Sequence, residues 1–160
     1  MNMSFTLQEV TAFLWKEADL LDRKAHDAWL ALWEEKGRYI VPIQPDATDF
    51  FNILNFANDD HAMRVMRVNR LRSGEAVSTT PPPRTSRLTA SIVIEADDGV
   101  TVKARAAQHL YEFHKDRARF YASILEYTLT RSGCGDFRIA QKIVRLLNSD
   151  DAIASVGYIL

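Results

Sequence analysis

The sequence predicts an α+β fold in which helices in the first half of the chain cover a strongly curved antiparallel sheet formed by the second half. Three observations support this prediction. Helical apolar stripes recur in residues 1–74, and four strand-like segments follow one another through 88–147 with short turns between them. The third of these segments, 120–131, is apolar on both sides, so both faces of the sheet are expected to be covered. At 160 residues, we expect a single domain over 1–160.

The first helix is expected to follow Thr6, because Thr6 and Glu9 have the spacing of a capping box. An apolar helical stripe then runs along this helix through Val10, Leu14, Ala18 and Leu21. A second short helix is expected to carry Trp29 and Trp33 and to end at Gly37, where glycine permits a left-handed C-cap.

A first strand is predicted at residues 39–43, with Pro42 placing it at a sheet edge or close to its own end. The segment 44–58 shows no clear period, but it is too apolar for a free linker and is expected to pack on something. A third helix is predicted over 61–73, capped by Asp59 or Asp60 and closed by Gly74.

The sheet segment begins with apolar and polar residues that alternate from Leu88 to Ala96, followed by a tight turn over 97–99. In the long second strand, 100–114, the apolar side chains change parity near Ala107 and Gln108, which predicts a bulge and a sharp bend. Strands over 120–131 and 137–147 complete a four-strand meander.

Composition excludes several classes of protein. The net charge of −1 indicates no general polyanion-binding character. The single cysteine, Cys134, excludes an internal disulfide and a cysteine-based zinc or iron–sulfur cage, and it suits a reducing cytoplasm. No run of about 18 apolar residues and no signal peptide is seen, so a cytoplasmic chain without membrane contact is expected.

Arginines are concentrated in the third predicted helix and just after the triple proline 81–83. Nucleic-acid binding is one interpretation, but interleaved aromatics are absent and the chain is slightly acidic. The other is a solvated or subunit-facing strip, since arginine pairs well with carboxylates at interfaces. The arginines concerned are Arg64, Arg67, Arg70, Arg72, Arg84 and Arg87.

Three blocks of sequence resemble the small (beta) subunit of the aromatic-ring-hydroxylating dioxygenases, which are Rieske non-haem iron oxygenases. The first is similar to the family's amino-terminal helix pair and first strand, the second to its arginine-rich helix and proline segment, and the third to its last strand. These blocks are 13–22 with 27–32 and 39–42, then 64–74 with 81–88, and finally 137–146.

The resemblance implies a cone-shaped fold like that of nuclear transport factor 2, with helices over the concave face. It also implies a structural role, in which the chain self-associates as a trimer and assembles with a large (alpha) subunit, three of each, to dihydroxylate aromatic compounds. No cofactor is expected in this chain; the Rieske cluster and the mononuclear iron are expected in the large subunit. The residues expected at subunit interfaces are Arg64, Arg67, Arg70, Arg84, Thr85, Arg87 and Tyr127.

An alternative is a stand-alone enzyme of isomerase or dehydratase type, because folds of this superfamily often hold an acid–base pocket. Its candidate residues would be Asp22, His26, His109 and Tyr111, gathered under the helices. A metal site is not expected, since His109 and His114 are five residues apart on a strand and therefore point to opposite faces.

Overall fold

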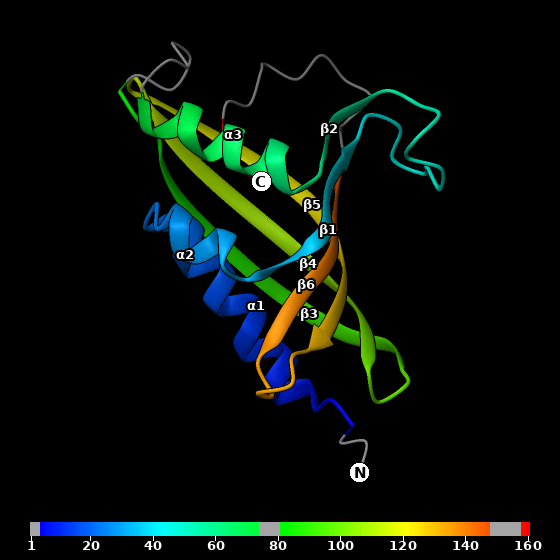
Figure 1. Cartoon of the computed structure of the whole chain (residues 1–160). Helices are drawn as coiled ribbons and strands as arrows, with labels where there is room; N and C mark the ends of the chain where they lie inside the picture. The colour runs from blue at the N-terminus through cyan, green and yellow to red at the C-terminus, as the bar shows by residue number, and fades with distance from the viewer. Residues whose placement is uncertain (1–3, 74–80, 148–157) are drawn as a thin grey trace.

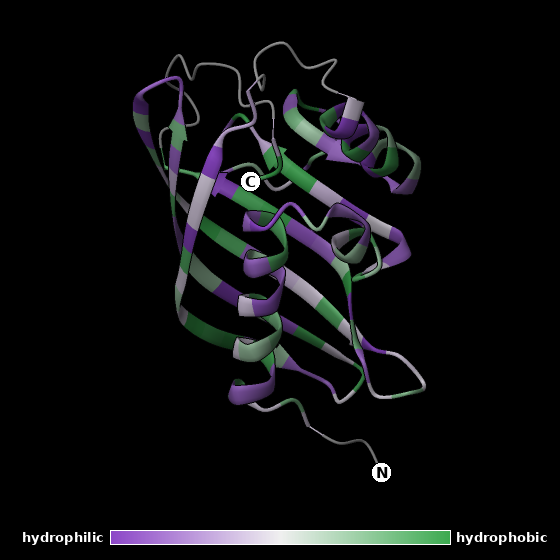
Figure 2. Cartoon of the chain, turned by 90° about the vertical axis from the view of Figure 1, so that its left-hand side faces the viewer, coloured by the Kyte–Doolittle hydropathy of each residue, from purple (hydrophilic) through white to green (hydrophobic). Residues whose placement is uncertain are grey.

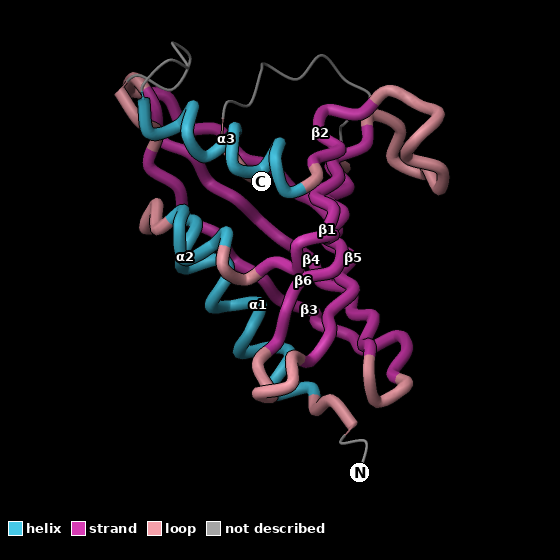
Figure 3. The backbone as a smooth tube through the Cα atoms, viewed as in Figure 1, coloured by secondary structure: helices cyan, strands magenta, loops and turns pink. Residues whose placement is uncertain are grey.

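Three helices lie on one side of a six-stranded sheet in the computed structural model, which describes residues 4–73, 81–147 and 158–160 (Figures 1 and 3). The face of the sheet that α1 covers is called the inner face below, and the opposite face the outer face. The elements are α1 (Leu7–Asp22), α2 (His26–Leu30), β1 (Trp33–Pro42), β2 (Asn55–Asp59), α3 (His61–Ser73), β3 (Arg84–Asp97), β4 (Thr101–His114), β5 (Arg117–Arg131) and β6 (Phe137–Leu146).

The strands pair in the order β2-β1-β6-β5-β4-β3, and every neighbouring pair is antiparallel except β1 with β6. This arrangement confirms the predicted α+β class and the meander from β3 to β6. The sheet is not strongly curled, however, so the strong curvature expected from the sequence is corrected.

The capping box at the start of α1 is confirmed. The Glu9 amide donates to Thr6 Oγ1 at 3.2 Å, and the Thr6 amide donates to Glu9 Oε2 at 2.9 Å. Two of the first amides of the helix, which have no partner inside it, are thereby satisfied. The predicted stripe of Val10, Leu14 and Leu21 is buried against the sheet.

The second helix is shorter than predicted, because α2 ends at Leu30 and the chain enters β1 at Trp33. Gly37 is therefore inside a strand and not at a helix C-cap. A Cβ on Gly37 would lie 2.8 Å from the Ile139 carbonyl oxygen and 3.0 Å from the Trp33 ring. Close approach of β6, and not a left-handed turn, is what requires glycine here.

The strand predicted at 39–43 is an internal strand between β2 and β6, and Pro42 is its last residue. Of the two positions predicted for Pro42, the strand end is the one observed. The segment between β1 and β2 extends beyond the sheet (Figure 1). Its Phe50 packs with Ile40 and Ile143 on the outer face, while Phe51 and Leu54 are exposed. Asp60 caps α3, since its Oδ1 accepts from the Met63 amide at 2.9 Å.

The bulge predicted in β4 lies in β3 instead. β4 pairs with β5 in continuous register along its whole length, whereas the β3–β4 register shifts between Ala90 and Val93 and again between Ile94 and Ala96. Ser91, at the first shift, has φ +54. The apparent parity change in β4 has another cause, because Gln108 and Glu112 are buried on the inner face.

Strands in which hydrophobic and hydrophilic residues alternate are visible in Figure 2. The main core lies between α1 and the inner face, and its largest fully buried side chains include Trp29, Tyr39, Leu110 and Leu125. No helix within the described ranges is long and apolar enough to span a membrane.

Candidate functional site

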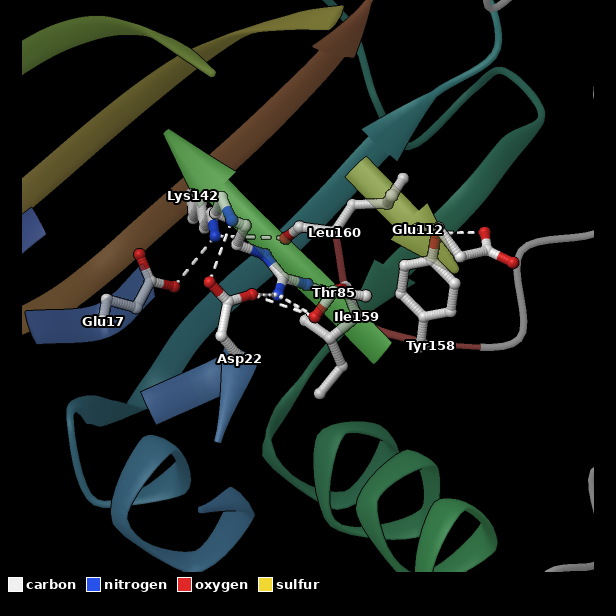
Figure 4. A network of polar contacts seen from close by, with 9 residues as sticks. Glu17, Asp22, Thr85, Glu112, Lys142, Tyr158, Ile159 and Leu160 are labelled. Carbon is white, nitrogen blue, oxygen red and sulfur yellow. Dashed lines mark hydrogen bonds and ion pairs between the residues drawn. The ribbon is translucent and has the colours of Figure 1, made fainter. Parts of the chain in front are cut away.

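A buried ion pair joins α1 to β6 on the inner face of the sheet (Figure 4). Lys142 Nζ lies 2.9 Å from Glu17 Oε1, and both side chains are at most 2% exposed. Glu17 faces inward because it follows the buried Phe13 and Leu14 by four and three residues on α1. It also accepts from the Trp29 indole N–H at 3.0 Å and from the Tyr127 hydroxyl at 2.5 Å.

Burial dominates the electrostatics of this cluster. It lowers the pKa of Lys142, against the opposing influence of the Glu17 carboxylate. It raises the pKa of Tyr127 well above the ordinary value, and the neighbouring Glu17 raises it further. Tyr127 therefore stays a neutral hydroxyl donor, which suits a structural hydrogen bond.

A second polar cluster is built around Asp22, the last residue of α1. Its carboxylate accepts from the Thr85 hydroxyl at 2.9 Å, from the Arg87 amide at 2.9 Å and from the Arg87 guanidinium at 2.5 Å. The Arg87 side chain is only 2% exposed, so this carboxylate balances a buried charge. Arg87 also donates to the Ile159 carbonyl oxygen.

Residues 158–160 lie against the inner face of the sheet, with Tyr158 partly buried and the next two residues inside the molecule (Figure 4). Ile159 is 2% exposed and Leu160 5%, and both belong to the main hydrophobic core. Lys142 Nζ donates to the Leu160 carbonyl oxygen at 3.1 Å, and the Leu160 amide donates to the Tyr39 hydroxyl at 3.0 Å. The Tyr158 hydroxyl donates to Glu112 at 2.6 Å.

A pocket of only about 40 Å³ remains next to this segment, lined in part by His26, Thr85 and Arg87. That volume holds roughly one to three water molecules and no aromatic substrate. Burial, followed by the positive charge of Arg72, lowers the pKa of His26, so the imidazole is held neutral. Both carboxylate oxygens of Asp22 already accept hydrogen bonds from Thr85 and Arg87, which disfavours a role for Asp22 as an acid or base.

The predicted acid–base pocket does not form, because its four candidate residues are not gathered together. His26 lines the inner pocket and Asp22 is bound to two other residues of its lining, whereas His109 and Tyr111 lie on the outer face of β4. Tyr111 is 49% exposed. The expectation that these two side chains point inward is corrected, since it depended on a bulge in β4 that is absent.

Two of the predicted interface arginines make their contacts inside this chain, with buried groups of neighbouring elements. Arg64 is fully buried: its guanidinium stacks on the Trp33 ring at 4.4 Å and donates to the carbonyl oxygens of Gly37 and Glu34. Arg67 makes a two-pronged ion pair with the buried Asp59, at 2.6 and 3.0 Å. Arg64 is therefore corrected from a surface strip to a core position.

The other predicted interface residues divide into two groups. Arg87 and Tyr127 are buried in the clusters described above, so the surface role expected for these two is corrected. Thr85 is half-buried beside Asp22, and its interface role stays a prediction. Arg70 and Arg84 are exposed, and their interface role stays a prediction.

The outer face carries a cluster of exposed rings that site prediction missed. Tyr111 pairs with Phe120 across β4 and β5, with ring centroids 4.9 Å apart, and the His109 ring lies 5.2 Å from Phe120. We call this cluster, with the adjacent Leu88 and Phe113, the outer aromatic patch; Leu88, Tyr111, Phe113 and Phe120 are each 47–64% exposed. Apolar residues on both sides of β5 were the signal in the sequence.

Comparison with known proteins gives a consistent result. Residues 16–150 match the family model described as ring hydroxylating beta subunit. The chain is 31% identical over 153 residues to the small subunit of anthranilate 1,2-dioxygenase from Acinetobacter baylyi, covering 92% of this chain and 91% of that protein.

Two solved structures show the fold. The beta subunit of benzoate 1,2-dioxygenase from Burkholderia mallei is 27% identical, with a TM-score of 0.78 and coverage of 98% and 99% of the two chains. A nuclear transport factor 2-like protein with a cystatin-like fold, from Novosphingobium aromaticivorans, has a TM-score of 0.62 at 16% identity, covering 92% and 83%. This neighbour confirms the predicted fold family.

Proposed function

The chain belongs to the ring hydroxylating beta subunit family and is a small subunit of an aromatic-ring dioxygenase; from this premise, we propose that its role is structural. It holds a hetero-oligomer together and contributes no catalytic group of its own. The observation that carries this proposal is the contrast between the two faces of the sheet. The inner face is filled by the chain itself, and the outer face presents exposed rings.

The filled interior supports a non-catalytic role. Where an acid–base enzyme would need open space beside its acid and base, Glu17 is bound to Lys142 and Asp22 to Arg87. Ile159 and Leu160 pack into the core beside these pairs, and only about 40 Å³ is left open next to them. Substrate chemistry is therefore assigned to another subunit.

The outer aromatic patch supports a subunit interface. Contiguous exposed apolar area rimmed by charge is typical of protein–protein contact. Arg84 pairs with Phe113 in the β3–β4 register and is exposed beside the patch. In the proposed complex this surface is buried by a neighbouring subunit, and Arg70 on α3 is a second proposed contact.

The partner is a large oxygenase subunit, and the proposed stoichiometry is three of each chain, with the small subunits associating as a trimer. Iron–sulfur clusters of the Rieske type need two cysteines and two histidines. This chain has one cysteine, and its described part contains no cluster of three metal-ligating side chains. The chain does not fit such a group, so the cluster and the mononuclear iron are assigned to the large subunit of a cytoplasmic complex.

The proposed substrate class is aromatic carboxylates. Anthranilate and benzoate, after which the relatives above are named, are both of this class. The complex would dihydroxylate such a ring. The choice of compound within the class is a property of the large subunit under this proposal.

The test is native mass combined with metal analysis, on this chain alone and after co-expression with a large oxygenase subunit. We expect a metal-free oligomer from the chain alone and an iron-containing mixed complex from the pair. A chain that stays monomeric and ignores the partner would overturn the assembly role. Iron and dioxygenase activity in the large subunit expressed without this chain, at unchanged levels, would overturn it equally.

A further inference from the structure

Residues 158–160 are held against the sheet by polar contacts from several strands and by apolar packing, as a bound peptide would be. Four strands contribute one polar contact each, through Tyr39 of β1, Arg87 of β3, Glu112 of β4 and Lys142 of β6. Two of these contacts go to main-chain carbonyl oxygens and one to a main-chain amide. The Ile159 and Leu160 side chains meanwhile pack into the apolar core.

The two cations that contact this segment keep their own counter-ions. Arg87 is paired with Asp22, and Lys142 with Glu17, through bonds that do not involve residues 158–160. The charged groups therefore do not need the segment for neutralisation. Removing it would leave a preorganised apolar pocket with carbonyl-binding donors at its walls.

We propose that the interior under α1 is a peptide-binding pocket that the chain fills with its own residues 158–160. Its ligand class is a short hydrophobic peptide. Arg87 and Lys142 donate hydrogen bonds to main-chain oxygens of this peptide, and Glu112 accepts one from its tyrosine hydroxyl. Because the segment is tethered, its effective concentration excludes competitors in the full chain. Without it, the pocket accepts the same sequence in trans.

The experiment compares the full chain with a variant that ends at residue 157, using the free peptide acetyl-Gly-Tyr-Ile-Leu as the probe. Losing two buried aliphatic side chains and their hydrogen bonds should lower the melting temperature of the variant by roughly 10 °C or more. Added peptide should restore it in a saturable manner. Tryptophan fluorescence should change in parallel, because the Trp29 and Trp33 rings lie 6.1 and 6.3 Å from Tyr39.

Two controls make the response specific. The full chain should show no shift with the peptide, because its own segment occupies the pocket. A peptide with aspartate in place of isoleucine should not act on the variant, since a carboxylate cannot be buried in the apolar pocket without a partner.

Leu160→Asp in the full-length chain is a second variant, in which the added charge expels the segment. It should bind the free peptide as the shortened chain does. If the shortened chain does not fold alone, refolding in the presence of the peptide should recover it in proportion to peptide concentration. An unchanged melting temperature, a folded variant that ignores the peptide, or no recovery on refolding would each overturn the proposal. None of these measurements involves the large subunit, so they are independent of the proposed assembly role.

Discussion

At the scale of single residues, this chain buries charges that stabilise its own fold. Glu17, Asp22, Arg87 and Lys142 form two ion pairs beneath α1 with hydrogen bonds to further partners. Burying a charge is costly, and the mutual attraction of a pair only offsets that cost when the geometry is good. Removing one member of a pair should therefore lower the free energy of unfolding more than removing both.

Lys142→Met should lower the free energy of unfolding by about 3–5 kcal/mol, because Glu17 is left as a buried charge without its cation. The double variant Glu17→Gln with Lys142→Met should be more stable than Lys142→Met alone. Urea denaturation at pH 7 measures both. A double variant less stable than the single one would show that the ion pair itself, and not the stranded charge, determines the effect.

The raised pKa of buried Tyr39 leads us to expect that the protein loses stability at alkaline pH. Burial raises its pKa to about 12, whereas the unfolded chain titrates near 10. The native state holds the proton more tightly, so the contribution is complete below pH 10 and is lost as the pH rises through 12. At pH 11 the loss amounts to about 1.4 kcal/mol.

Tyr39→Phe should be free of this loss. The difference in free energy of unfolding between wild type and Tyr39→Phe, measured in urea, should therefore shift by about 1.4 kcal/mol in favour of the variant between pH 8 and pH 11. The shifted pKa of buried Tyr127 also lowers the stability as the pH rises, and that of Lys142 raises it. Both residues are present in wild type and in the variant, so their effects drop out of the difference between the two proteins. A difference independent of pH would contradict the prediction.

At the scale of elements, close contacts between neighbouring segments set where helices end and strands begin. Arg64 on α3 stacks on the Trp33 ring and binds two carbonyl oxygens of β1. These contacts fix the extended start of β1 directly after α2. The strand then runs parallel to β6 and lies so close to it at Gly37 that a side chain would clash there.

Gly37→Ala should destabilise the protein by about 1–3 kcal/mol, because a Cβ would lie 2.8 Å from the Ile139 backbone oxygen. Gly133→Ala is the matched control, since nothing lies within 4 Å of a Cβ there. Thermal melting of the two variants checks the pair. Equal melting temperatures would mean that β1 and β6 can separate at no cost.

At the scale of the whole molecule, the sheet has one face for its own core and one for a neighbour. The inner face is closed by α1, α2 and residues 158–160 (Figures 1 and 4). On the outer face, the described residues leave the aromatic patch exposed. An assembly subunit needs both properties, because it must fold alone and still present apolar area to a partner.

Phe113→Glu should weaken association with the large subunit or between small subunits by roughly 100-fold, because a carboxylate would replace an apolar group in a buried contact. Arg84 is the cross-strand neighbour of Phe113, and Arg84→Glu should weaken the same association by roughly 10-fold. Both side chains are exposed in the single chain, so its melting temperature should change little.

Val100→Glu is the matched control, since Val100 is 58% exposed but lies outside the outer aromatic patch. Native mass of the co-expressed complex measures all three variants. An intact complex with Phe113→Glu would place the interface elsewhere.

The parts of the fold that depend on local signals could be predicted from the order of the residues. The capping box at Thr6, the helix at 61–73 and the strands of the meander follow from spacing and turn chemistry, and the turn predicted at 97–99 is displaced by only one residue, to 98–100. The family could also be identified from the sequence, because its blocks span nearly the whole chain. A second apolar side on β5 already indicated a neighbour.

Which polar groups are buried could not be predicted from local patterns, because burial depends on the side chains that other elements pack against them. Arg64 and Arg70 belong to the same arginine-rich helix, yet one is fully buried beneath Trp33 and the other is exposed. Gln108 and Glu112 occupy inward positions, which reversed the predicted facing of His109 and Tyr111. Nor could spacing show that Ile159 and Leu160 return to fill the interior, since a long-range contact leaves no periodic signal in the sequence.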